Sequence, residues 1–170
     1  MSLRLTSLIV FGLLVNGCTF SAPQFEAGIR FVERVASGKS ETAQEPRATW
    51  LASVGDRGAV LNPYLANGLT VFANVDGYAI AFDGWTIRSI TGFGLSSPVS
   101  VTGKDGARVF VYGGAQTTTD CGAWTRSGLN WEQVCANGLG QITLDEAGNI
   151  QSITMALGNK LGIVTLRVAN

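Results

Sequence analysis

The chain contains no histidine among its 170 residues. This absence removes Ser-His-Asp and Cys-His nucleophilic systems and every histidine-ligated metal site. Charged residues are also scarce, at 14%, and the 12 basic residues balance the 12 acidic ones. A net charge of zero gives no electrostatic reason to expect nucleic-acid binding. The composition therefore argues against the common classes of enzyme, though not against carboxylate-based ones.

The N-terminal region lacks an apolar run of the length that a membrane-spanning helix needs, about twenty residues. Arg4 precedes a shorter apolar run over residues 5–15, and Gly17 and Cys18 follow it. This order is typical of a bacterial lipoprotein signal, because a small residue precedes the cut and a cysteine follows it. We expect residues 1–17 to be removed and Cys18 to be lipidated. The alternative is an ordinary secretory signal cut near Ala22, with Cys18 discarded.

Thr19 follows the cysteine, where inner-membrane lipoproteins of enteric bacteria carry Asp. The sequence therefore favours the periplasmic face of the outer membrane. Several acyl chains, palmitate among them, would hold the protein stably, whereas a single chain gives only marginal binding.

Two cysteines, Cys121 and Cys135, remain once Cys18 is assigned to lipid. In an oxidising compartment an even pair predicts a disulfide bond. A loop of this length gives a stabilisation of about 3 kcal/mol in the chain-entropy model. The alternative is two separate buried thiols, and too few ligands are present for a zinc site.

Residues 21–38 have helical periodicity, because Phe25, Ile29, Val32 and Ala36 share one face. Such a helix either lies on the membrane beside the lipid or packs on the sheet of the domain. The second interpretation is favoured, since the polar face is not rich in lysine and arginine. With the linker that follows, residues 18–47 form the lipidated N-terminal part, and residues 48–170 form a β-domain.

Residues 48–170 contain short runs of β-branched and aromatic residues separated by turn signals such as Asp-Gly pairs. We predict a mainly β protein with a strongly curved antiparallel sheet, either bifurcated or a partial barrel, and one N-terminal helix. The expected strands are Trp50–Val54, Leu69–Val75, Tyr78–Phe82, Trp85–Ile90, Val99–Thr102, Arg108–Gly113, Trp131–Ala136, Gln141–Leu144, Ile150–Ala156 and Ile163–Val168.

Four tryptophans could stack on sugar rings or fill the core, namely Trp50, Trp85, Trp124 and Trp131. Trp124 and Trp131 are the predicted glycan contacts, because they lie within the loop that the disulfide closes. Arg88 and Arg126 could bind acidic sugars, although ordinary exposed positions are the simpler interpretation.

Four aspartates lie at or near glycines: Asp76, Asp83, Asp105 and Asp145. Carboxylate pairs can cleave glycosidic bonds, but these residues already serve as turn formers. The glycine-rich segments 92–94 and 112–115 precede no helix, so they predict turns and not nucleotide binding. We therefore expect no enzyme, no metal and no cofactor.

Two segments, residues 76–94 and residues 145–154, resemble the YjbF family of outer-membrane lipoproteins, which includes the GfcB-like group 4 capsule lipoproteins. The matching positions are Gly84, Ile87, Thr91 and Gly92 in the first segment, and Asp145, Gly148 and Ile150 in the second. In the family one residue separates the positions of Thr91 and Gly92. The resemblance implies a curved, bifurcated antiparallel β-structure without a catalytic motif.

The resemblance further implies an accessory role in exopolysaccharide or capsule production or export, performed by binding and localisation. The partners would be the membrane, through the lipid, and polysaccharide or polysaccharide-export proteins. Two alternatives stay open from the residues alone. One is a periplasmic lipid or lipoprotein carrier with an apolar groove, and the other is a carboxylate-dependent glycan-cleaving enzyme.

Overall fold

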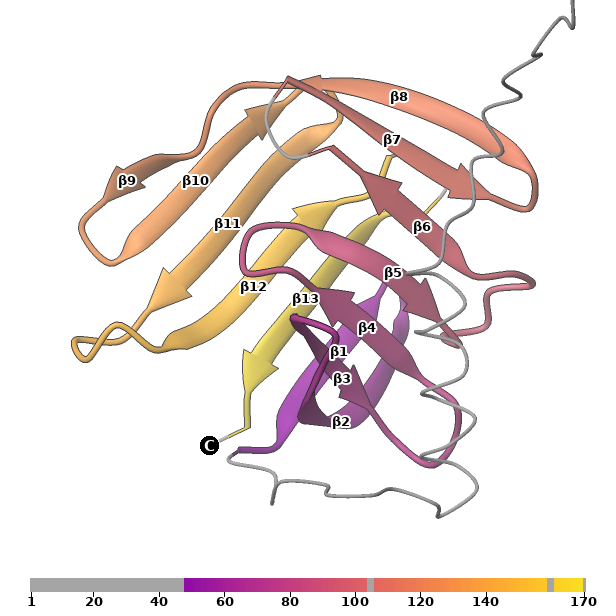
Figure 1. The fold of residues 1–170 in the computed structure, drawn as a ribbon, viewed down its shortest axis with the longest axis horizontal. Coiled ribbons are helices and arrows are strands. Elements are labelled where there is room, and N and C mark those ends of the chain that lie inside the picture. The colour runs from indigo at the N-terminus through magenta and orange to yellow at the C-terminus, as the bar shows by residue number, and fades with distance from the viewer. Residues whose placement is uncertain (1–47, 104–105, 159–160, 170) are drawn as a thin grey trace, which may run out of the picture.

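The computed structural model describes residues 48–103, 106–158 and 161–169 (Figure 1). These residues contain strands and turns but no helix. The predicted signal peptide over 1–17, the predicted lipidation site Cys18, the predicted helix over 21–38 and Asp105 lie outside the described residues.

Thirteen strands form one antiparallel sheet in which neighbours along the chain are mostly neighbours in space. The strands are β1 (Trp50–Val54), β2 (Arg57–Ala66), β3 (Leu69–Ala73), β4 (Ala79–Phe82), β5 (Ile87–Thr91), β6 (Val99–Thr102), β7 (Gly106–Tyr112), β8 (Ala115–Cys121), β9 (Thr125–Ser127), β10 (Asn130–Cys135), β11 (Gly138–Leu144), β12 (Ile150–Ala156) and β13 (Ile163–Val168). The prediction of a mainly β, antiparallel domain is confirmed.

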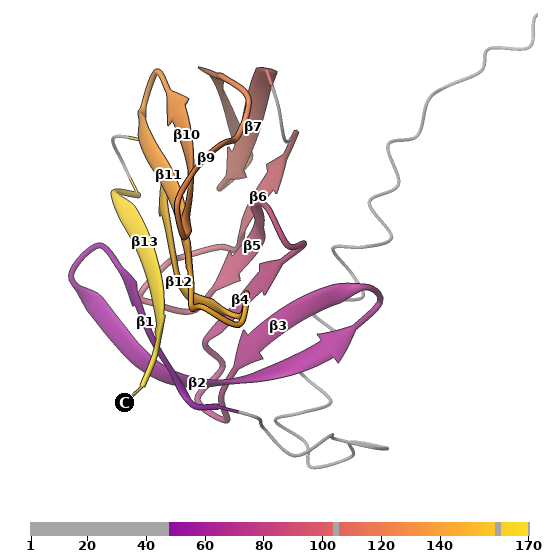
Figure 2. The same ribbon diagram turned by 90° about the vertical axis from the view of Figure 1, so that its left-hand side faces the viewer.

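The sequence predicted a bifurcated sheet or a partial barrel, and the structure differs: the sheet closes on itself. β13 pairs with β1, β10 pairs with both β8 and β11, and β9 pairs only with β10. Twelve strands therefore form a closed antiparallel barrel, and β9 lies outside it as an extra strand. Figure 2 shows the β2–β3 hairpin running across one end of the molecule and β7, β10 and β11 at the other.

The interior of the barrel holds the main hydrophobic core, because side chains alternate between the two faces of each strand. Trp50, Ala52 and Val54 of β1 point inward, for example, while Leu51 and Ser53 point outward. Trp50 packs against Phe72 of β3 with ring centroids 4.8 Å apart. Trp50 is therefore a core residue and not a surface contact.

Pro63 explains why the sequence did not reveal β2. Proline removes a backbone donor and is normally excluded from central strands. β2 tolerates it because the strand changes partners midway: residues 57–61 pair with β1, and residues 62–66 pair with β3. Pro63 therefore lies in the half of β2 that has no neighbour on the β1 side.

Two further strands were missed because they carry little apolar signal. β8 is mostly exposed and contains three consecutive threonines, and β9 has only three residues, all exposed. Four expected strands have the predicted bounds, namely β1, β6, β12 and β13. The Gly113–Gly114 turn between β7 and β8 has positive φ at both residues, as a tight hairpin requires.

The predicted disulfide between Cys121 and Cys135 is present, and it lies on the seam that closes the barrel. β8 and β10 share a single residue pair, which is the two cysteines themselves. Backbone bonds flank this pair: Gly122 N donates to Val134 O at 2.8 Å, and Ala136 N donates to Asp120 O at 2.8 Å. Since β7–β8 has seven residue pairs, the β8–β10 seam is a weakly paired part of the ring.

We expect the double variant Cys121→Ser/Cys135→Ser to lose about 3 kcal/mol of unfolding free energy, because the bond restricts the unfolded chain over this loop. Chemical denaturation of the mature protein, followed by tryptophan fluorescence, measures the loss. Reductant should lower the midpoint of the wild-type protein and leave that of the double variant unchanged. Equal midpoints for oxidised wild type and double variant would contradict this account.

Candidate functional site

Three of the four tryptophans come together from separate parts of the chain. Trp85 lies in the β4–β5 turn, Trp124 in the β8–β9 connection and Trp131 on β10. The ring centroids of Trp85 and Trp131 are 4.9 Å apart in an edge-to-face arrangement, and those of Trp85 and Trp124 are 5.8 Å apart. Such pairs add about 0.5–1.5 kcal/mol each beyond area burial. We call these three residues the tryptophan cluster.

The tryptophan cluster is half-buried and packs against the main core. The structure therefore brings the predicted glycan contacts Trp124 and Trp131 to one place, where the rings of both contact that of Trp85. The sequence offered Trp85 as a possible sugar contact. It did not place Trp85 beside Trp124 and Trp131, because the β4–β5 turn is far from both of them along the chain. Each of the three rings packs against the core and stays partly exposed, so a core role accounts for much of their burial.

Asp83 fixes the turn that presents Trp85. Its Oδ1 accepts hydrogen bonds from the backbone N–H groups of Trp85 at 2.9 Å and Thr86 at 2.6 Å. Its Oδ2 pairs with Arg88, at 2.7 Å from Nε and 2.6 Å from Nη2. Arg88 also donates from Nη1 to Gly103 O at 3.0 Å. Arg88 is therefore engaged in holding this turn, a structural role that accounts for it without an acidic sugar.

A buried polar network lies beneath Trp124. Arg108 of β7 is 1% exposed, and its Nη2 donates a hydrogen bond to Gln133 Oε1 of β10. Gln133 in turn donates from Nε2 to Gly122 O at 2.6 Å. The guanidinium carbon of Arg108 lies 5.8 Å from the centroid of the Trp124 ring, a cation–π distance. The network thus ties β7, β10 and the β8–β9 connection together.

Sequence reasoning missed Arg108 and Gln133, although one signal was available. Arg108 occupies the same face of β7 as Phe110, which is buried. An arginine within an inward-facing series predicts a buried charge that needs hydrogen-bond partners. Gly140 on β11 makes room for this arrangement, since an added Cβ there would approach Trp124 Cη2 to 3.3 Å.

The exposed end of the tryptophan cluster carries a positive charge. Arg126 of β9 is exposed and pairs in register with Trp131 of β10. Its guanidinium carbon lies 5.8 Å from the centroid of the Trp131 ring, and its Nε donates to Gly128 O at 3.1 Å. A tryptophan face beside a guanidinium can contact the apolar C–H face of a sugar and pair with a carboxylate or phosphate.

Three of the four aspartates, Asp76, Asp83 and Asp145, lie in turns of the structure. Asp145 accepts hydrogen bonds from Asn149 N at 2.8 Å and from Gln151 Nε2 at 3.0 Å. Hydrogen bonds from Asn149 lower the pKa of the Asp145 carboxyl group below its ordinary value. Asp76 lies in the β3–β4 turn and contacts Asn74, while Asp105 lies outside the described residues. Within the described ranges no three carboxylate or cysteine groups are placed to hold a metal ion.

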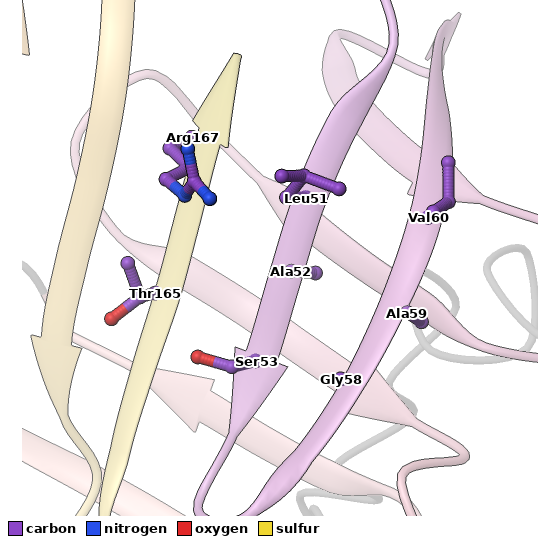
Figure 3. Close-up of a pocket in the computed structure, with 8 residues that line it drawn as sticks. All are labelled: Leu51, Ala52, Ser53, Gly58, Ala59, Val60, Thr165 and Arg167. Atoms are coloured by element: carbon purple, nitrogen blue, oxygen red, sulfur yellow. The ribbon is translucent and has the colours of Figure 1, made fainter. Parts of the chain in front are cut away.

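A separate depression of about 440 Å³ lies on the outer surface across β13, β1 and β2 (Figure 3). Leu51, Val60 and Arg167 line it together with small and polar residues. It is wide open to solvent, and it belongs to strands other than those of the tryptophan cluster. The interior of the barrel, by contrast, is occupied by large apolar side chains such as Phe82, Ile153 and Met155, each at most 2% exposed.

Comparison with known proteins identifies the fold. No protein-family model matches the chain, and no curated protein matches it in sequence. The crystal structure of the hypothetical lipoprotein YmcC from Escherichia coli (K12) is similar. The TM-score is 0.50 at 12% sequence identity, and the match covers 86% of this chain and 94% of that one. The chain shares the fold of this hypothetical lipoprotein. Across the described residues we find no helix with the length and hydropathy of a membrane span.

Proposed function

We propose that this protein is a lipid-anchored accessory protein of the outer membrane in exopolysaccharide or capsule production or export. Acyl chains on Cys18 hold it at the periplasmic face of the membrane, and the β-domain contributes binding. Its partners are polysaccharide or the proteins that export it. The YjbF family, which residues 76–94 and 145–154 resemble, has this role.

The observation that carries the proposal is the agreement between the N-terminal signal and the fold. The signal over 1–17 and Cys18 predict a lipoprotein without reference to the rest of the chain. The β-domain independently has the fold of a protein described as a lipoprotein. Two separate parts of the sequence therefore support the same class of protein.

The tryptophan cluster and Arg126 supply a surface for an acidic glycan. The disulfide lies at the base of the β9–β10 hairpin, which presents both Trp131 and Arg126. A hairpin tied at its base loses less conformational entropy when it binds a ligand. An aromatic ring and a guanidinium at 5.8 Å match a repeating unit that has an apolar sugar face and an anionic group.

The alternative functions receive less support from the described residues. A lipid or lipoprotein carrier needs an apolar groove, whereas the barrel interior is packed and the outer depression on β13, β1 and β2 is open. A glycan-cleaving enzyme needs two carboxylates facing one cleft. The carboxylates of Asp83 and Asp145 instead accept backbone hydrogen bonds in two different turns.

Complementation of a deletion strain tests the proposed role. Loss of the gene should reduce secreted polysaccharide, and the wild-type gene should restore it. Cys18→Ser, which removes the acylated thiol, should fail to restore secretion and should leave the membrane fraction. Unchanged polysaccharide in the deletion strain would refute the role, and a Cys18→Ser protein that stays in the outer-membrane fraction would refute the anchor.

The glycan surface is tested by charge removal at two arginines. Arg126→Gln removes the guanidinium beside Trp131, and Arg167→Gln makes the same change on the outer face of β13. Retention of the purified protein on an immobilised acidic polysaccharide should fall about tenfold for Arg126→Gln, because one charge-assisted contact contributes about 1.5 kcal/mol. Arg167→Gln should behave as wild type. Equal retention of the two variants would refute the proposal that the surface around Arg126 binds an acidic glycan.

A further inference from the structure

A second apolar cluster lies on the outer face of the barrel, on the side of β3 and β4 that points away from the main core. It consists of Val71, Ala73, Ala79 and Ala81, with Tyr64, Ala66 and Leu69 packed at its edge. Strand register confirms the side, because Phe72 and Ile80, which alternate with these residues, point into the barrel. We call these seven residues the outer apolar face.

The four central residues of the outer apolar face are between 0% and 6% exposed, as buried as the interior of the barrel. The outward side of a single layer of strands is normally open to water, so short side chains such as alanine are not buried there by the sheet alone. An apolar sheet face of this kind is suited to being covered by another part of the chain.

We propose that the amphipathic segment over residues 21–38 lies on the outer apolar face. The segment has helical periodicity, with Phe25, Ile29 and Val32 on its apolar side. The alanines of β3 and β4 leave room for such large side chains. In the sheet β3 lies between β2 and β4, so β2 and β4 are about 10 Å apart. A helix is about 10 Å wide and therefore covers these three strands.

The path of the chain supports this occupant. The described chain begins at Ala48, and Trp50 pairs with Leu61 of β2. The next residue of β2, Asn62, pairs with Ala73 at the end of β3. The chain therefore enters the domain beside the outer apolar face. Residues 39–47 span up to about 30 Å when extended, which is enough to return a helix onto that face.

The outer apolar face would then be the side of the domain nearest the bilayer. Cys18 precedes the amphipathic segment by three residues, which span about 10 Å when extended. This orientation rests on the lipid anchor of the proposed function, whereas the packing of residues 21–38 on the sheet does not depend on it.

Site-specific photocrosslinking tests the packing in the full mature protein. A photoreactive residue, p-benzoylphenylalanine, replaces Leu69 at the edge of the outer apolar face. The matched control places it at Leu65, which lies on the same hairpin, points to the opposite side and is 77% exposed. Peptide mapping by mass spectrometry should find Leu69 crosslinked to residues 21–38 of the same chain, and Leu65 not.

Two variants make the result decisive. Ile29→Asp, which puts a charge on the apolar side of the segment, should abolish the crosslink from position 69 while the β-domain stays folded. Cys18→Ser should keep the crosslink, so that failure of the lipid anchor and failure of this proposal are distinguishable. A crosslink from position 69 to a second copy, to another protein or to nothing would overturn the proposal.

Discussion

The closure of the sheet at the β8–β10 seam is the constraint on which the rest of the structure depends. Most neighbouring strands in the ring share four or more residue pairs, but this seam has one pair and two flanking backbone hydrogen bonds. The disulfide between Cys121 and Cys135 lies at this point, so a covalent bond joins β8 and β10 where few backbone hydrogen bonds do. It ties the base of the β9–β10 hairpin to the neighbouring strand.

The seam also determines where the candidate site lies. Arg108, Gln133 and Trp124 all approach it from inside, and their hydrogen bonds and ring contact cross from β7 to β10. The three rings of the tryptophan cluster pack against the core next to this network, and each is partly exposed. The hydrogen bonds of a buried polar network offset the cost of removing its groups from water only when the partners are held in place. The closed seam therefore links the stability of the barrel to the positioning of Trp131 and Arg126.

Much of the fold could be predicted from the sequence, because strand period and turn chemistry are local signals. β1, β6, β12 and β13 have the expected bounds, and the disulfide follows from the cysteine count. The misses have physical causes. Pro63 is tolerated only through a change of partner. The three consecutive threonines of β8, of which Thr119 is buried, show no alternation of apolar residues. The contact of Trp85 with Trp124 and Trp131 depends on ring closure, which no local pattern encodes.

Amide hydrogen exchange of the oxidised and the reduced protein tests most directly whether the disulfide maintains the seam. The backbone N–H groups of Gly122 and Ala136 donate the two hydrogen bonds across it. Reduction should speed their exchange, while the amides of the β12–β13 pair keep their protection. Equal exchange at Gly122 and Ala136 in both states would contradict the account, because the seam would then close without the covalent bond.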